Sequence, residues 1–155
     1  MTFVTAERIE WVYIASEMER QMEDYKSAAA RHWDGVHILS LSHRWQEAAY
    51  LAGYVAECSF KALLQASALP DVQRLGHRLT ILSKEALELA LVLTPAAARY
   101  PIQSGLANWH TEQRYEATAP GREPEFRQMV QQADEIARAI LIGMVLDGLL
   151  EEVPL

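Results

Sequence analysis

The segment Ala48–Leu64, AAYLAGYVAECSFKALL, constrains the fold of this chain more than any other part of the sequence. It is too apolar and too rich in small residues for an ordinary surface helix, and small side chains allow a neighbouring helix to approach closely. It also carries Glu57 and Lys61, which lie four residues apart in the order that favours a helical ion pair. The segment therefore predicts a closely packed helix in which Glu57 and Lys61 form a structural pair.

Helical periodicity extends over almost the whole chain, and strand signals are nearly absent. Residues 5–41 are expected to form one helix, or two helices with a break near Lys26–Arg31. The other expected helices are Arg44–Ser67, Arg78–Leu93, two short pieces within Ala96–Asn108, and a last helix from Pro124 to about Leu150. The segments Leu69–Gly76 and Ala117–Glu123 are expected to be loops. The pattern predicts an all-α fold, an up-and-down antiparallel bundle of four to five helices in a single domain over residues 1–155.

Length and composition indicate a globular protein of the cytoplasm. A chain of 155 residues corresponds to about one domain. The longest apolar run, Ala139–Leu146, is far shorter than the ~20 residues that a membrane span needs. The N-terminus has neither the basic start nor the apolar core of a signal peptide. Cys58 is the single cysteine, which excludes an internal disulfide, favours a reducing compartment and is expected to be a small buried helix residue.

The charge is distributed unevenly along the chain. The net charge of −7 argues against nonspecific coating of nucleic acid. Residues 74–122 nevertheless hold six cations and four anions, together with His77 and His110, so that this stretch is net positive. A locally basic middle in an acidic chain allows a focused anion site.

No metal or cofactor is expected from the motifs of the sequence. His32, His37 and His43 are spaced by five and six residues, off a single helical face, and have no cysteine partner. The chain has no Gly-rich phosphate loop, no Gly-x-Ser-x-Gly elbow and no paired-carboxylate motif of recognisable spacing.

Three stretches, taken in order, resemble proteins of the HEPN-domain family, whose name stands for a nucleotide-binding domain of higher eukaryotes and prokaryotes. Ala48–Leu64 is similar to a family helix that reads much like AxYLAGYxxECxLKAL. His77-Arg78-Leu79 is similar to a His-x-Leu that follows it, and Trp109–Tyr115 to a Trp-containing stretch that ends in Arg-Tyr. The resemblance covers about Asp24–Leu150 and makes the first twenty or so residues an N-terminal helical extension.

The resemblance implies a HEPN-like bundle that is often dimeric, so that a homodimer is expected. It also implies a separately encoded minimal nucleotidyltransferase as a partner, in a toxin–antitoxin or defence pair. Many HEPN proteins are metal-independent ribonucleases whose motif is an Arg followed, after four to six residues, by a His. No His follows Arg114, and the one match, Arg31–His37, lies on the first segment. Six helical residues turn these two side chains about 240° apart, so we interpret the match as accidental.

The candidate ligand-binding residues lie in the basic middle of the chain: Arg74, His77, Arg78, Trp109, His110, Arg114 and Tyr115. An Arg of this set would bind phosphate, a His would transfer a proton, and an aromatic ring would stack on a base. In the structural alternative, His77 buttresses the start of the third helix and Trp109 belongs to the core. Arg114 then pairs with Glu112 or with a helix C-terminus.

The preferred hypothesis is a non-catalytic module that binds a nucleotide, RNA or a partner protein. One alternative is a metal-independent ribonuclease toxin with an atypical Arg/His site, built from Arg78 or Arg114 and from His77 or His110. The other is a purely structural dimerisation module. The missing Arg–His motif and the acidic net charge favour the first hypothesis.

Overall fold

A computed structural model of the chain describes residues 24–66, 72–90, 104–146 and 148. The helices are α2 (Tyr25–Leu41), α3 (Trp45–Ala66), α4 (Leu79–Ala90), α5 (Ser104–Ala107) and α6 (Glu123–Leu146). Three short 3-10 helices join them: η1 (Val72–Leu75), η3 (Thr111–Tyr115) and η4 (Pro120–Arg122). The described part contains no strand, which confirms the all-α class. The expected extension before Asp24, and most of the expected pieces within Ala96–Asn108, lie outside these ranges.

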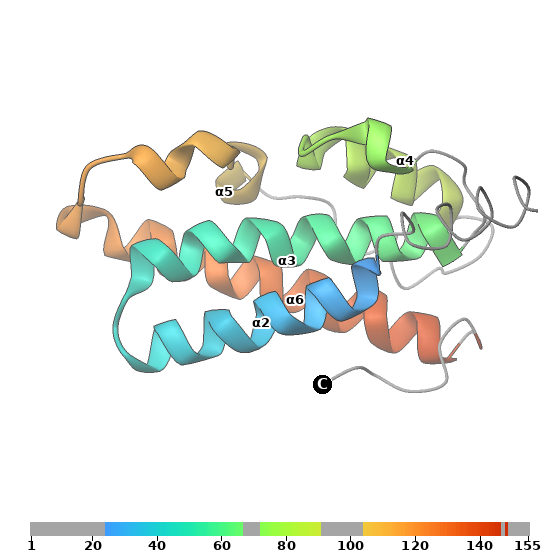
Figure 1. Cartoon of the computed structure of the whole chain (residues 1–155), viewed down its shortest axis with the longest axis horizontal. Coiled ribbons are helices and arrows are strands. Elements are labelled where there is room, and N and C mark those ends of the chain that lie inside the picture. Colours follow the sequence, from blue (N-terminus) through green and yellow to red (C-terminus); the bar gives the residue numbers. More distant parts are fainter. Residues whose placement is uncertain (1–23, 67–71, 91–103, 147, 149–155) are drawn as a thin grey trace, which may run out of the picture.

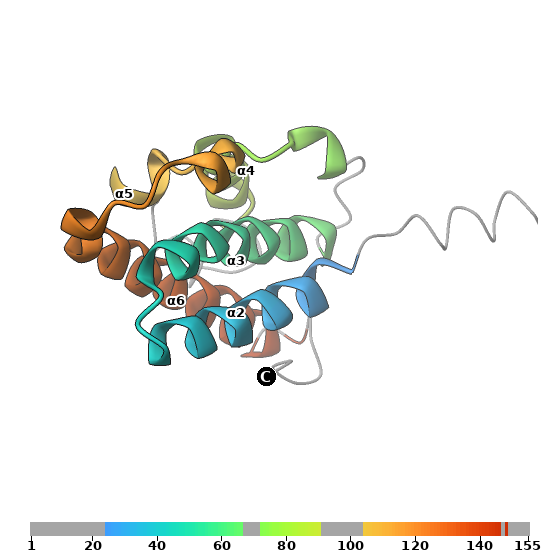
Figure 2. The ribbon, with the colours of Figure 1, turned by 60° about the vertical axis from the view of Figure 1, so that its left-hand side comes forward.

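Helix α3 lies in the middle of the molecule, with α2 and α6 on one side and α4 and α5 on the other (Figures 1 and 2). α2 runs antiparallel to α3, but α6 runs in the same direction as α3. The starts of the two parallel helices meet, because the Arg127 guanidinium lies over the Trp45 ring. The chain between them returns along α3 through α4, α5 and η3.

The burial of α3 follows from its small residues. Fourteen of its 22 residues are buried, and they include the alanines at positions 48, 49, 52, 56 and 62. At Gly53 the packing is closest, because a Cβ there would collide with the indole ring of Trp109. Cys58 is a free, buried helix residue, as expected from the sequence.

Helix α2 begins at its own N-cap. The Asp24 carboxylate accepts hydrogen bonds from the Ser27 backbone N–H at 3.1 Å and from the Ser27 hydroxyl at 2.6 Å. The helix then continues without interruption through Lys26–Arg31 and Gly35 to Leu41. No break occurs within Lys26–Arg31, and the capped start of the helix lies just before this stretch, at Asp24. Whether residues 5–23 form a separate helix lies outside the described residues.

The buried apolar residues of α2 and α6 face the core. They are Tyr25, Ala29, Trp33 and Val36 on α2, and Phe126, Met129, Ala133, Ile136, Ala137, Ile140, Leu141 and Met144 on α6. Both expected loops contain a 3-10 turn, η1 in one and η4 in the other. Helix α6 begins at Glu123, one residue before the expected start at Pro124, because η4 leads directly into it. None of the helices in the described ranges combines the length and the hydropathy that a membrane crossing needs.

Candidate functional site

A row of polar side chains follows one face of α3. Tyr50, Tyr54, Glu57 and Lys61 are spaced by four, three and four residues, which places them on the same side of a helix. The hydroxyl oxygens of Tyr50 and Tyr54 are 3.0 Å apart and hydrogen-bonded. The row ends at two pockets, which we name by their most informative residues, the Arg114 pocket at the Tyr50 end and the His77 pocket at the Lys61 end.

Glu57 and Lys61 form the predicted ion pair, and both are buried. The Lys61 Nζ donates to Glu57 Oε1 at 2.7 Å, and the two side chains are only 5% and 4% exposed. The structure adds a third member, because Nδ1 of His77 lies 3.0 and 2.9 Å from the two carboxylate oxygens of Glu57. His77 stands two residues before α4 and so ties the start of that helix to α3. These contacts agree with the structural alternative, in which His77 buttresses the start of this helix.

The His77 pocket has a volume of about 440 Å³ and is formed by α2, α3 and the residues before α4. Its polar lining includes Arg31 of α2, the Glu57–Lys61 pair and the exposed His77 ring. Tyr54 lies beside it, with its ring 5.5 Å from that of His32 and 6.2 Å from that of His77. Two imidazoles thus approach one phenol on the α3 surface.

Burial changes the titration of the two inner members of this cluster. It lowers the pKa of His32, and the positive charge of Arg31 lowers that pKa further. It also raises the pKa of Tyr54, as does the hydrogen bond with Tyr50. Both side chains are therefore neutral near pH 7.

Trp109 belongs to the core. Its Nε1 donates to the backbone carbonyl of Tyr50 at 3.0 Å, and its ring meets that of Tyr54 edge-on at 4.9 Å. The ring covers Gly53 and is only 5% exposed. It is not available to stack on a base, and the structural alternative for Trp109 is correct.

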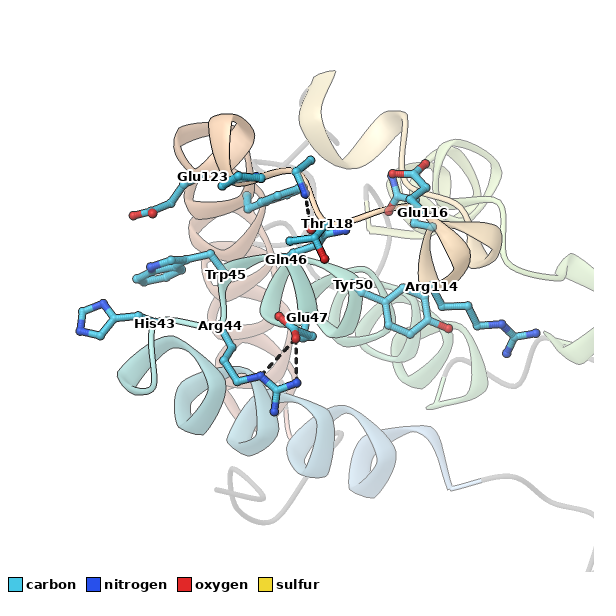
Figure 3. A pocket seen from close by; sticks show the side chains of 14 residues that line it. His43, Arg44, Trp45, Gln46, Glu47, Tyr50, Arg114, Glu116, Thr118 and Glu123 are labelled. Carbon is cyan, nitrogen blue, oxygen red and sulfur yellow. Dashed lines mark hydrogen bonds and ion pairs between the residues drawn. The ribbon is translucent and has the colours of Figure 1, made fainter.

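The Arg114 pocket is the larger of the two, at about 580 Å³, a size typical of small-molecule sites. The beginnings of α3 and α6 line it together with η3 and η4 (Figure 3). Its aromatic lining comes from Trp45, Tyr50 and Phe126. The Arg114 side chain lies at one end of the pocket and extends past the Tyr50 ring (Figure 3).

Every carboxylate that lines this pocket is already paired with an arginine. The three pairs are Glu47 with Arg44 at 2.7 Å, Glu116 with Arg122 at 3.3 Å, and Glu123 with Arg127 at 2.6 Å. The hydrogen bond from Arg44 lowers the pKa of Glu47, so this group stays charged.

Arg114 is the exception among the charged residues of the pocket. Its guanidinium stacks on the Tyr115 ring at 4.7 Å and pairs with no carboxylate of the described residues. The expected pair with Glu112 is not formed, because the Glu112 carboxylate lies 3.3 Å from His110 instead.

The remaining predicted residues are not gathered into one site. Arg74 in η1, Arg78 before α4, His110 and Tyr115 are all exposed. Of these, only Tyr115 lies against Arg114.

Arg31 and His37, the accidental Arg–His match, have different surroundings. Arg31 lines the His77 pocket, whereas His37 lies 3.7 Å from Asp134 of α6. Within the described ranges, no group of three His, Cys, Asp or Glu side chains is arranged to hold a metal.

Several residues around the two pockets were not among the predicted binding residues: Tyr50, Tyr54 and His32, and Trp45 and Phe126 of the Arg114 pocket. The two tyrosines belong to the helical row that the sequence displays, and their spacing was the available signal. His32 had no such signal, because its position beside Tyr54 depends on how α2 packs against α3.

Comparison of the chain with protein-family models, with curated proteins and with solved structures finds no match.

Proposed function

We propose that this protein binds a nucleotide, free or within RNA, in the Arg114 pocket. The observation that carries the proposal is the Arg114 guanidinium, which contacts tyrosines but no carboxylate of the described residues, among carboxylates that all have arginine partners. An arginine without a carboxylate, at the edge of a pocket with aromatic walls, offers two donors to a phosphate in a fixed geometry.

The pocket supplies complementary groups for the two halves of such a ligand. Arg114 and the Tyr50 hydroxyl bind the phosphate at one end. The rings of Trp45 and Phe126, each with an arginine guanidinium over it, provide aromatic walls for a base. The exposed Tyr115 ring lies against Arg114 and offers a further stacking surface beside the pocket.

The proposal includes a HEPN-like architecture, a homodimer and a minimal nucleotidyltransferase as partner. It is supported by the arrangement of the three segments that carry the resemblance. The first lies within α3, and the other two contact this helix. His77 reaches Glu57, and Trp109 covers Gly53. The gene that lies beside this one tests the partner, and light scattering tests the dimer.

Fluorescence anisotropy of a fluorescein-labelled, ten-nucleotide single-stranded RNA tests the binding. We expect Arg114→Ala to weaken binding about tenfold or more, because a charge-assisted hydrogen bond is lost. Arg138→Ala is the matched control, since it also removes one positive charge, but from an α6 residue that pairs with Asp134 outside the pocket. Equal affinities for the two variants, or no binding by the unaltered protein, would refute the proposal.

A ribonuclease with an atypical site is the second candidate, and the Glu57–His77 contact favours it. Glu57 holds one nitrogen of an exposed imidazole, and the other nitrogen, which has no hydrogen bond to the described residues, is available for proton transfer. Incubation with total RNA in the presence of EDTA tests this candidate. Cleavage that disappears in His77→Asn supports it, and intact RNA removes it.

A further inference from the structure

We infer that the Arg114 pocket selects nucleotides with a single phosphate group over diphosphates and triphosphates. The inference rests on the proposed function and adds the class of ligand to it. It concerns the charge that the pocket tolerates and makes no claim about which base is bound.

The first step is the charge of the lining. Five permanently charged side chains line the pocket: Arg44, Glu47, Arg114, Glu116 and Glu123. Each of the three carboxylates is paired with an arginine, two of them with Arg122 and Arg127 from outside the lining, and the described part of the pocket offers only Arg114 without a carboxylate partner. One phosphate group satisfies that cation, and a second group finds no further unpaired cation in the lining.

The second step is the position of the carboxylates. Glu47 and Glu116 lie on either side of the space next to Tyr50, and Glu123 lies at the end opposite Arg114 (Figure 3). A phosphate chain that extends from Arg114 into the pocket therefore approaches carboxylates. A chain that extends outward enters solvent and gains no contact with the lining. An added phosphate group meets carboxylates and no unpaired cation in the first case, and it is without benefit in the second.

Competition against the labelled RNA measures this selectivity directly. The competitors are 3′,5′-cyclic AMP, AMP, ADP and ATP, at pH 7.5 with EDTA so that no divalent cation neutralises the phosphates. We expect AMP and cyclic AMP to compete at least about tenfold more strongly than ATP, with ADP between them, because each added charge costs about threefold.

Charge variants that keep side-chain shape provide a second readout. Glu47→Gln frees Arg44 and adds one positive charge to the lining. We expect it to improve ATP competition about threefold more than AMP competition. Glu135→Gln is the matched control, because Glu135 lies on α6 outside the pocket and contacts Gln131.

The outcomes separate this inference from the proposed function. The inference is supported if AMP competes more strongly than ATP and if this difference becomes smaller in Glu47→Gln but not in Glu135→Gln. ATP that competes as well as AMP or better overturns the inference while leaving nucleotide binding intact. RNA binding with which none of the nucleotides competes also overturns it. The proposed function itself fails where the labelled RNA does not bind the unaltered protein, or where it binds the Arg114→Ala and Arg138→Ala variants equally.

Discussion

The contact between Gly53 and Trp109 explains at the scale of single residues why two distant stretches of the chain belong together. The indole ring occupies the space where any other residue at position 53 would place its Cβ. The indole N–H donates a hydrogen bond to the backbone carbonyl of Tyr50, which lies on the same helix as Gly53. Trp109 thus fixes η3, and with it Arg114, against α3.

Gly53→Ala tests this contact. The new methyl group must displace the Trp109 ring, and we expect a loss of about 2–3 kcal/mol in the free energy of unfolding, as for other overpacked cores. Urea denaturation measures the loss. Gly121→Ala is the control, because a Cβ at Gly121 meets no atom within 4 Å and should change stability by less than about 0.5 kcal/mol. Similar losses in both variants would show that the close approach is not energetically important.

Single residues also show where sequence reasoning reached its limit. The Glu57–Lys61 pair was predictable, since both members lie on one helix at a fixed spacing. The contact of His77 with Glu57 was not, because it joins residues 20 positions apart across a loop. For Arg114 the sequence left a structural role and a binding role open, and the difference depends on which carboxylates the fold assigns to other arginines.

At the scale of elements, α3 is held to its neighbours by apolar packing and by one buried ionic cluster. Lys61, Glu57 and His77 join the end of α3 to the start of α4. A buried ion pair adds little net stability, but the loss of one partner leaves an uncompensated charge. The cluster therefore fixes the position of the start of α4 against α3.

Glu57→Gln removes the charge that Lys61 and His77 share. We expect a loss of about 3–5 kcal/mol in the free energy of unfolding, measured by urea denaturation, because the Lys61 ammonium remains buried. Glu123→Gln breaks an exposed pair with Arg127 at the same four-residue spacing and should cost less than about 1 kcal/mol. The double variant Glu57→Gln/Lys61→Met should recover part of the loss. A single variant as stable as the unaltered protein would contradict the account.

The starts of α3, α4 and α6 were predictable to within one residue. The predicted second helix, Arg44–Ser67, agrees with α3 at Trp45–Ala66. The start of α2 was not predicted, although Asp24 and Ser27 form a local cap. The periodic apolar stripe runs on through this point and conceals the boundary.

The whole molecule carries a net charge of −7, and this limits how it can bind a polyanion. If Arg114 is the principal phosphate contact, binding releases few counterions. We expect RNA affinity to fall by less than about tenfold between 50 and 200 mM salt, since one or two contacts give a shallow dependence for single strands. Anisotropy titrations at several salt concentrations measure the slope. A loss of a thousandfold would indicate a broad basic surface instead.

The arrangement of the whole molecule was only partly accessible from the sequence. Amphipathic stripes and short connections predict a bundle, because each helix must bury one face. They do not show that α3 contacts both α2 and α6, or that α3 and α6 run in parallel. That choice depends on how the chain returns along α3 through α4, α5 and η3.

The parallel course of α3 and α6 has an electrical consequence at the Arg114 pocket. Each helix concentrates about half a positive elementary charge at its N-terminus. Both N-termini line this pocket, since α3 begins at Trp45 and α6 at Glu123. Their fields add there to the charge of Arg114. Part of the attraction for an anion thus resides in the backbone, so Arg114→Ala should weaken binding without abolishing it.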